Sequence, residues 1–288
     1  MARTALAPIV RFTRRTEALT GETGQPHLSE RLDVAGRDEL SRLATSFNTT
    51  LDALEAALAA QRQLIADASH ELRTPIASLR ANIQVLGEAE RLPPDEQRRL
   101  RADIVEELDE LTALVGDVVE LARGARGDDE LSDVRVDEIV ADAVAAARRR
   151  GEARFELELQ PTIVRGESAR INRAVSNLLD NARKWSPPDG VVEVKLRDGV
   201  LSVCDHGPGF AEGELPRVFE RFYRSERARK LPGSGLGLAI VRQAAEAHGG
   251  WARAGNAGGG GARLDVSFGA HTALTEPDER LAVGSTQG

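Results

Sequence analysis

Apolar residues recur every seven positions over one long segment of the chain. Ile65, Leu72, Leu79 and Leu86 are spaced by seven, and Ala68, Ile76 and Ile83 fill the same helical face. After a turn at 92–95, a second series follows at helical spacing: Leu100, Ile104, Leu108, Leu111, Val115, Val118 and Ala122. The two segments predict an antiparallel helical hairpin, and a single hairpin would leave a broad apolar face in water. We therefore expect a homodimer whose two hairpins form a four-helix bundle.

The segments before and after this hairpin have different patterns. Upstream, a short helix at 8–20 and another from Asp38 are predicted to pair with those of a second chain. Downstream of a linker at 124–133, the pattern changes to mixed α and β. Helices are expected at 137–150, 168–185 and 235–248, and strands at 155–159, 191–196, 200–204 and 263–268. From His271 the chain is polar and aperiodic, which predicts a disordered tail at 271–288.

Composition excludes several classes of protein. The net charge of −8 leaves no basic surplus for phosphate contacts, so nucleic acid is not an expected partner. The single cysteine, Cys204, excludes an internal disulfide and lies in an apolar run, where we expect a structural thiol. No stretch reaches the roughly 18 apolar residues that span a bilayer. The chain as given is therefore expected to be soluble, and its single cysteine fits a reducing compartment such as the cytoplasm.

One histidine lies away from the apolar stripe of the hairpin. At about 100° per residue, His70 falls roughly 140° from Ile65, so its imidazole is expected to face solvent. Thr74 shares this face one turn later. A neutral imidazole in such a position can act as a nucleophile. An isolated histidine at such a position would be interpreted as an ordinary surface residue. A functional interpretation of His70 therefore depends on the residues around it.

Several strings downstream suit a nucleotide. Asn177, Asn181 and Lys184 are spaced to share one helix face, where carboxamide oxygens can hold Mg²⁺ and an ammonium can reach a phosphate. The string Asp205-His206-Gly207-Pro208-Gly209 follows a strand, with glycines that permit close backbone approach. The string Gly233-Ser234-Gly235-Leu236-Gly237 opens a helix, whose N–H groups attract phosphate. Each string alone is compatible with a solvated face or a turn.

Taken in order, these strings resemble those of bacterial sensor histidine kinases. The string Ser69-His70-Glu71-Leu72-Arg73-Thr74-Pro75 is similar at every position to their phosphoacceptor motif. The downstream strings, with Phe219 to Arg224, look like the N, G1, F and G2 boxes of the ATP-binding fold named Bergerat or GHKL. The resemblance covers nearly the whole chain. It implies a HAMP-like signal relay at 1–58, a dimerisation and phosphotransfer domain at 59–123 and a catalytic α/β two-layer sandwich at 134–270.

The resemblance also implies an activity and its catalytic residues. His70 would take a phosphoryl group from Mg·ATP and pass it to an aspartate in the receiver domain of a response regulator. Glu71 would be its acid–base partner, and Thr74 would position water for dephosphorylating the regulator. In membrane-bound members HAMP directly follows a transmembrane helix. We therefore expect the full-length protein in the inner membrane, attached through N-terminal segments absent from this chain.

For the nucleotide, the resemblance implies one role for each matching position. Mg²⁺ would be bound by Asn181 with Asn177, and the adenine amino group by Asp205. Phosphates and the purine would be held by the remaining box residues: Lys184, Trp185, Gly207, Gly209, Arg221, Gly233, Ser234, Gly235, Leu236 and Gly237. Trp185 departs from the Tyr or Phe usual beside the adenine, although its ring also suits stacking.

Two other functions fit parts of the sequence. A GHKL ATPase without kinase activity would lack the acceptor string at 69–75. A scaffold that binds nucleotide without catalysis would be expected to have lost Asn181, Asp205 or one of the glycines at 233–237, and all of these are present. The stimulus and the identity of the regulator are not encoded in any of these strings.

Overall fold

The computed structural model describes residues 31, 39–87, 93–123, 131–149, 154–228, 231 and 233–273. The chain divides into two compact units, 1–69 and 70–288. The helix predicted at 8–20 lies outside the described residues. Among the described helices, none has a segment both long and apolar enough to cross a bilayer.

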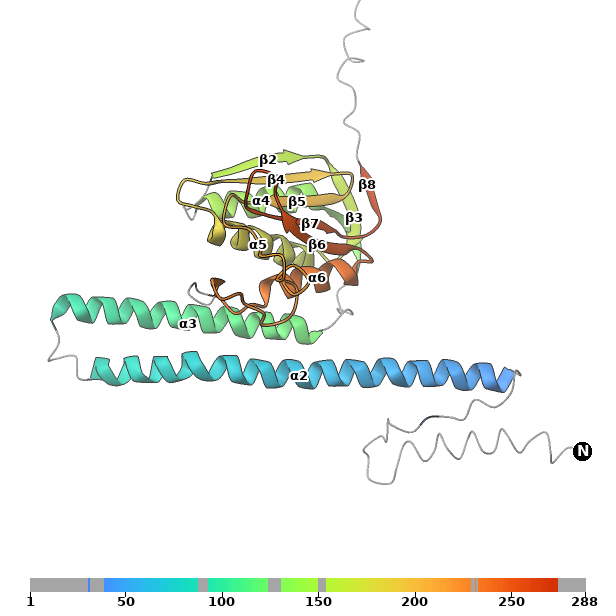
Figure 1. Ribbon diagram of the computed structural model, residues 1–288, viewed down its shortest axis with the longest axis horizontal. Helices are drawn as coiled ribbons and strands as arrows, with labels where there is room; N and C mark the ends of the chain where they lie inside the picture. Colours follow the sequence, from blue (N-terminus) through green and yellow to red (C-terminus); the bar gives the residue numbers. More distant parts are fainter. Residues whose placement is uncertain are drawn as a thin grey trace, which may run out of the picture. The chain divides into compact units, whose positions relative to one another are not determined.

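The first long helix, α2, runs from Glu39 to Gly87 without interruption (Figure 1). It includes Pro75 and confirms the helix predicted from Asp38 onward. In the first unit, the guanidinium of Arg31 donates hydrogen bonds to the carboxylates of Asp52 and Glu55, both at 2.6 Å. These acidic residues are three positions apart on α2, so one arginine can reach both.

The second long helix, α3, runs from Pro94 to Arg123 and returns along the end of α2 (Figure 1). Proline suits the first turn of a helix because its missing N–H would have no partner there. Two side chains of α2, Ser78 and Asn82, donate hydrogen bonds to Glu107 of α3. The predicted helical hairpin is confirmed.

The apolar stripe of the hairpin is only half covered in one chain. Of the four residues spaced by seven, Leu72, Leu79 and Leu86 are partly buried, whereas Ile65 is 57% exposed. Ile76 and Ile83, which the prediction places on the same covered face, keep 53% and 52% of their surface exposed. Two helices can cover only one row of a broad stripe. On α3, Val105, Leu108, Val115 and Val119 are also 45–57% exposed.

The rest of the second unit contains two sheets. The five-stranded sheet has the order β2-β4-β5-β7-β6, in which β2 and β4 are parallel and all other pairs antiparallel. Its strands are β2 (Arg154–Leu159), β4 (Val191–Arg197), β5 (Val200–Cys204), β6 (Trp251–Asn256) and β7 (Ala262–Ser267). A small antiparallel sheet of order β1-β3-β8 contains β1 (Ser132–Arg135), β3 (Thr162–Gly166) and β8 (His271–Ala273).

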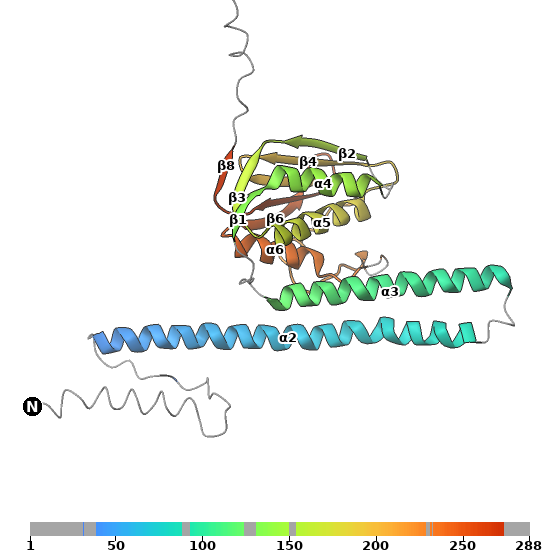
Figure 2. The same ribbon diagram turned by 180° about the vertical axis from the view of Figure 1, so that it is seen from behind.

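Three helices cover one face of the five-stranded sheet: α4 (Val136–Arg149), α5 (Ser168–Trp185) and α6 (Gly237–Ala247) (Figures 1 and 2). Alternate strand residues such as Val194, Leu201 and Val266 are 0–2% exposed and form one core with these helices. The other face is polar and carries ion pairs such as Lys195 with Glu193 at 2.7 Å. The α/β two-layer sandwich predicted from the sequence is confirmed.

Two sequence expectations at the edges of this domain need correction. The disordered tail is expected from His271, whereas residues 271–273 form β8 and pair with β3. The linker is expected to extend to residue 133, whereas β1 begins at Ser132 and also pairs with β3. Both strands are short and polar, so no apolar alternation marks them, and pairing with β3 satisfies their backbone groups.

Ion pairs join α3 to the α/β domain. Asp117 of α3 accepts a hydrogen bond from Arg173 of α5 at 2.5 Å. The buried guanidinium of Arg170 lies 3.5 Å from Glu120 of α3 and 3.4 Å from Glu167. These charges lie at the side of α5 that faces the hairpin, next to the functional site described below.

Candidate active site

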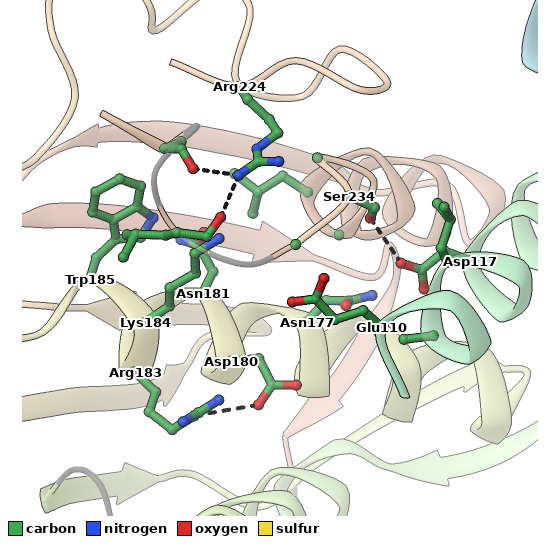
Figure 3. A pocket seen from close by; sticks show the side chains of 18 of the residues that line it. Glu110, Asp117, Asn177, Asp180, Asn181, Arg183, Lys184, Trp185, Arg224 and Ser234 are labelled. Atoms are coloured by element: carbon green, nitrogen blue, oxygen red, sulfur yellow. Dashed lines mark hydrogen bonds and ion pairs between the residues drawn. The ribbon is translucent and has the colours of Figure 1, made fainter. Parts of the chain in front are cut away.

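Helix α5 presents polar side chains on the side away from the core. Its apolar face, which includes Ile171, Val175 and Leu178, is fully buried. Asn177, Asn181 and Lys184 therefore project from the opposite side, as their spacing predicts. All three line one cavity of about 1160 Å³, together with Trp185 at the end of the helix (Figure 3).

The carboxamides of Asn177 and Asn181 are suited to a bound ion. Their amide nitrogens are buried and have no hydrogen-bond partner in the described part of the chain. A buried polar group without a partner is costly, so a ligand in the cavity would stabilise this arrangement. The described residues contain no cluster of three or more His, Cys, Asp or Glu that could enclose a metal. The amide oxygens of the same two side chains are ligands that Mg²⁺ accepts, whereas the unpartnered N–H groups would donate to an anionic ligand such as a phosphate.

Lys184 lies among charges of both signs. Burial lowers the pKa of its ammonium below the ordinary value, and the nearby Arg224 guanidinium lowers it further, while Glu110 of α3 opposes the shift. A Cβ added at Gly233 would lie 3.1 Å from Lys184 Nζ, so this ammonium faces the glycine-rich loop. A phosphate between this loop and Lys184 would favour the charged form of the ammonium.

The glycine-rich loop leads directly into α6. Gly233 and Gly235 have positive φ values of 126° and 76°, and the helix begins at Gly237 rather than at 235. Leu236 is fully buried and lines neither cavity, so its side chain anchors the loop. Ser234 donates a hydrogen bond to Asp117 of α3 at 3.3 Å (Figure 3). The N–H groups at the start of α6 are thus held beside the cavity.

A second, smaller cavity of about 90 Å³ adjoins the first, and Asn181 and Trp185 line both. The buried Asp205 lines it and accepts hydrogen bonds at Oδ1 from the backbone N–H groups of Gly207 (2.8 Å) and Ala262 (3.0 Å). Both bonds go to the same oxygen, which leaves Oδ2 to accept a donor from a ligand. A carboxylate at the end of a narrow cavity beside an indole ring fits a purine with an exocyclic amino group.

The arginine expected at the phosphates is not the one that lines the cavities. The motif predicts Arg221, but this residue lines neither cavity, whereas Arg224 lines both. Arg224 donates hydrogen bonds to the carbonyl of Ala228 at 2.5 Å and to that of Leu231. The segment from Phe219 to Arg224 contains both Arg221 and Arg224, so the sequence alone could not show which arginine lines the cavities.

Residues of the hairpin reach the larger cavity. Glu71 and Thr74 of α2 line it, while His70 is exposed and lies outside its lining. Helix α3 contributes Glu110 and Asp117, which sequence reasoning missed because no motif contains them. Most residues predicted for the site, from the hairpin and from the α/β domain, line one of the two cavities. The exceptions are His70, Gly207, Arg221 and Leu236, which line neither.

Comparisons with known families match three consecutive parts of the chain. Residues 1–56 match the HAMP domain, and residues 60–127 match the His Kinase A (phospho-acceptor) domain. Residues 166–272 match the family described as histidine kinase-, DNA gyrase B-, and HSP90-like ATPase. The cavity residues on α2 and those on α5 thus lie in segments that match two different families.

Proteins similar to most of this chain are found in mycobacteria. The signal transduction histidine-protein kinase/phosphatase MprB of Mycobacterium avium (strain 104) is 41% identical over 280 residues, 93% of this chain and 53% of that protein. MprB of Mycolicibacterium smegmatis is 42% identical over 87% of this chain and 52% of that protein. The chain therefore spans about half the length of the curated relatives it matches. The solved structure of Acinetobacter baumannii histidine kinase AdeS is 24% identical, covers 70% of this chain and 98% of that one, and has a TM-score of 0.55, which bears on the fold alone.

Proposed function

The chain belongs to the two-component sensor histidine kinases, and from this premise we propose that it phosphorylates its own His70 from ATP. It then passes the phosphoryl group to an aspartate of a response-regulator receiver domain, and it also dephosphorylates that regulator. One observation supports this proposal most directly. Glu71 and Thr74, beside the acceptor histidine, line the same cavity as Asn181 and Lys184.

In the first step, a ring nitrogen of His70 attacks the γ-phosphorus of ATP. An N–P bond forms, the bond from this phosphorus to the β–γ bridging oxygen breaks, and ADP leaves with the bonding electrons. Glu71, the next residue on α2, orients the imidazole and stabilises the positive charge that develops on the ring. In the second step the N–P bond breaks as an aspartate oxygen of the regulator bonds to phosphorus.

The residues of α5 and of the glycine-rich loop hold the nucleotide during this reaction. Mg²⁺ bound with ATP would supply charge neutralisation at the phosphates, and Asn177 and Asn181 would hold it. Lys184, Arg224 and the backbone at 233–237 bind phosphate oxygens. Phosphoryl transfer depends mainly on placement and charge neutralisation, so these groups suffice without a further nucleophile.

We also propose that the working unit is a homodimer formed by the hairpins. The apolar side chains that α2 and α3 leave exposed would be buried against a second copy. The match of residues 1–56 to HAMP supports a role in relaying a signal to the hairpin. It also supports a cytoplasmic location for this portion of an inner-membrane protein.

The acceptor is tested by incubation with γ-labelled ATP. The unmodified chain should acquire acid-labile, alkali-stable label, and His70→Gln should acquire none. His271→Gln, at an exposed histidine of β8, is the matched control and should be labelled normally. Equal labelling of His70→Gln would contradict the assignment. ATP binding without any labelling of the unmodified chain would instead favour a nucleotide-binding scaffold.

The metal assignment is tested by Asn181→Ala. This change removes a carboxamide from the cavity wall, so labelling of His70 should fall to background while the dimer persists by light scattering. Asn172→Ala, at an exposed position of the same helix, should be labelled normally. Retention of labelling in Asn181→Ala would place the metal elsewhere.

A further inference from the structure

The hairpin of β6 and β7 packs against the loop that follows β5. In this hairpin Asn256 pairs in register with Ala262. The N–H of Asp205 donates to the carbonyl of Ala262 at 3.0 Å, and Ala262 N–H donates back to Asp205 Oδ1 at 3.0 Å. At Gly261 the two backbones approach so closely that an added Cβ would lie 1.8 Å from the Asp205 carbonyl oxygen. The carboxylate of the smaller cavity is therefore held by the end of this hairpin.

The Asn256 side chain makes a second connection to the same loop. Its Oδ1 accepts from Phe210 N–H at 2.8 Å, and its Nδ2 donates to the Phe210 carbonyl at 2.8 Å. These two bonds reproduce with one carboxamide the pairing that a neighbouring strand would provide. No other hydrogen bond to either backbone group of Phe210 occurs within the described residues.

The clamped residue lies in the wall of the smaller cavity. Phe210 and the preceding Gly209 both line it, with Asp205 and Trp185. Gly209 has a φ of 67°, and an added Cβ would lie 2.7 Å from Asn256 Oδ1. Glycine is therefore needed here for its backbone conformation and for the approach of the asparagine. The segment 205–210 has no helix or strand hydrogen bonds of its own, so its conformation depends on such contacts.

We propose that Asn256 is a positioning residue for the adenine side of the nucleotide site. It fixes the backbone of Gly209 and Phe210, and so preforms the cavity in which Asp205 and Trp185 bind the base. This inference rests on the proposed function, because it assumes that ATP is the ligand. Asn256 itself is exposed and lines neither cavity, so it acts through the loop. The phosphate side, built from α5 and the start of α6, does not depend on it.

The experiment compares Asn256→Leu, which removes both hydrogen bonds, with Asn256→Asp, which keeps only the acceptor. In the leucine variant the KM for ATP in His70 labelling should rise about tenfold, with kcat at saturating ATP within about twofold. In the aspartate variant a carboxylate oxygen faces the Phe210 carbonyl oxygen in place of the donor, so the KM should also rise. Asn172→Leu, at the exposed asparagine on α5, should match the unmodified chain. Hydrogen exchange should show faster exchange of the Phe210 amide in Asn256→Leu, with unchanged exchange at Leu201 in β5.

Each outcome bears on one of the two hypotheses. Absence of ATP binding and labelling in the unmodified chain would refute the proposed function. Normal labelling in that chain, with an unchanged KM in both Asn256 variants, would overturn the role of Asn256 alone. A fall in kcat at unchanged KM would also overturn it. If Asn256→Leu does not fold, the decision rests on Asn256→Asp, whose KM must rise for the inference to stand.

Discussion

In the α/β domain, Val192, Leu201 and Leu264 are each 2% exposed or less, whereas in the hairpin Ile76 and Ile83 keep about half of their surface. Both regions have a clear apolar periodicity in the sequence. In the α/β domain three helices cover the apolar face of one sheet, so a single chain completes the core. In the hairpin two helices share a stripe that is wide enough for four.

This difference separates two kinds of stability in one chain. The core of the α/β domain should unfold in a manner independent of protein concentration. The hairpin should gain much of its stability from a second copy, so its unfolding should depend on concentration. The chemistry that we propose is divided in the same way, with the acceptor histidine on the hairpin and the nucleotide-binding residues on the α/β domain.

The largest expected effect comes from placing charges on the exposed row of α2. The double change Ile76→Glu and Ile83→Glu puts four carboxylates into each dimer interface. Burial of one such side chain stabilises by about 1.5–3 kcal/mol, so the dissociation constant should rise by more than about a thousandfold. Light scattering and sedimentation measure the change. Leu157→Glu, at a partly exposed leucine of β2, is the control and should remain dimeric. If the unmodified chain were monomeric at micromolar concentration, the proposal that the hairpin needs a second copy would be contradicted.

A smaller effect is expected from Thr74→Ala, which tests whether the hairpin contributes more than the acceptor. Thr74 lines the cavity, and its hydroxyl could hold a water but would contribute little to attack by the imidazole on ATP. Dephosphorylation of the regulator should slow about tenfold, roughly 1.4 kcal/mol in the barrier, while labelling of His70 stays nearly unchanged. The assay pairs label uptake by the kinase with decay of purified phosphoregulator. Loss of both activities in a dimeric variant would contradict this division.

The smallest expected effect is a pH dependence on the α/β side. Burial and Arg224 lower the pKa of Lys184, so its ammonium loses its proton at lower pH than an ordinary lysine. The protonated form attracts phosphate. Affinity for Mg·ADP should therefore decrease, about threefold, as the pH rises toward the ordinary lysine value of 10.5. Titration calorimetry at several pH values measures this. Lys184→Arg keeps its charge and should remove the decrease; an identical decrease in that variant would assign it to another group.

Sequence periodicity predicted the elements that bury an apolar face. The helix expected at 168–185 and the strand at 200–204 have the bounds of α5 and β5. Strand β6 was missed because it is rich in Ala and Gly and shows no alternation in burial. Strand β3 follows Pro161, and its buried positions Thr162, Val164 and Gly166 include only one large apolar side chain, so the sequence shows no apolar alternation there.

The site was predictable where its residues belong to one motif. Asn177, Asn181 and Lys184 share a helix face by spacing alone, and the structure places them in one cavity. Asp117 and Asn256 were not predictable, because their partners Ser234 and Phe210 are distant in sequence and meet only through the fold. Local patterns report local geometry, so contacts between separate elements require the tertiary structure.

The four glycines before β7 differ in how freely they can vary. A side chain at Gly258 or Gly259 would meet no atom within 4 Å, whereas one at Gly261 would overlap the backbone of Asp205. Substitutions or insertions at the first two positions should therefore leave the carboxylate of Asp205 undisturbed. The last can accept neither, because it has a φ of 91° and no room for a methyl group. Among natural variants of this chain, the length of the connection between β6 and β7 should vary at 258–259, whereas Gly261 should be retained.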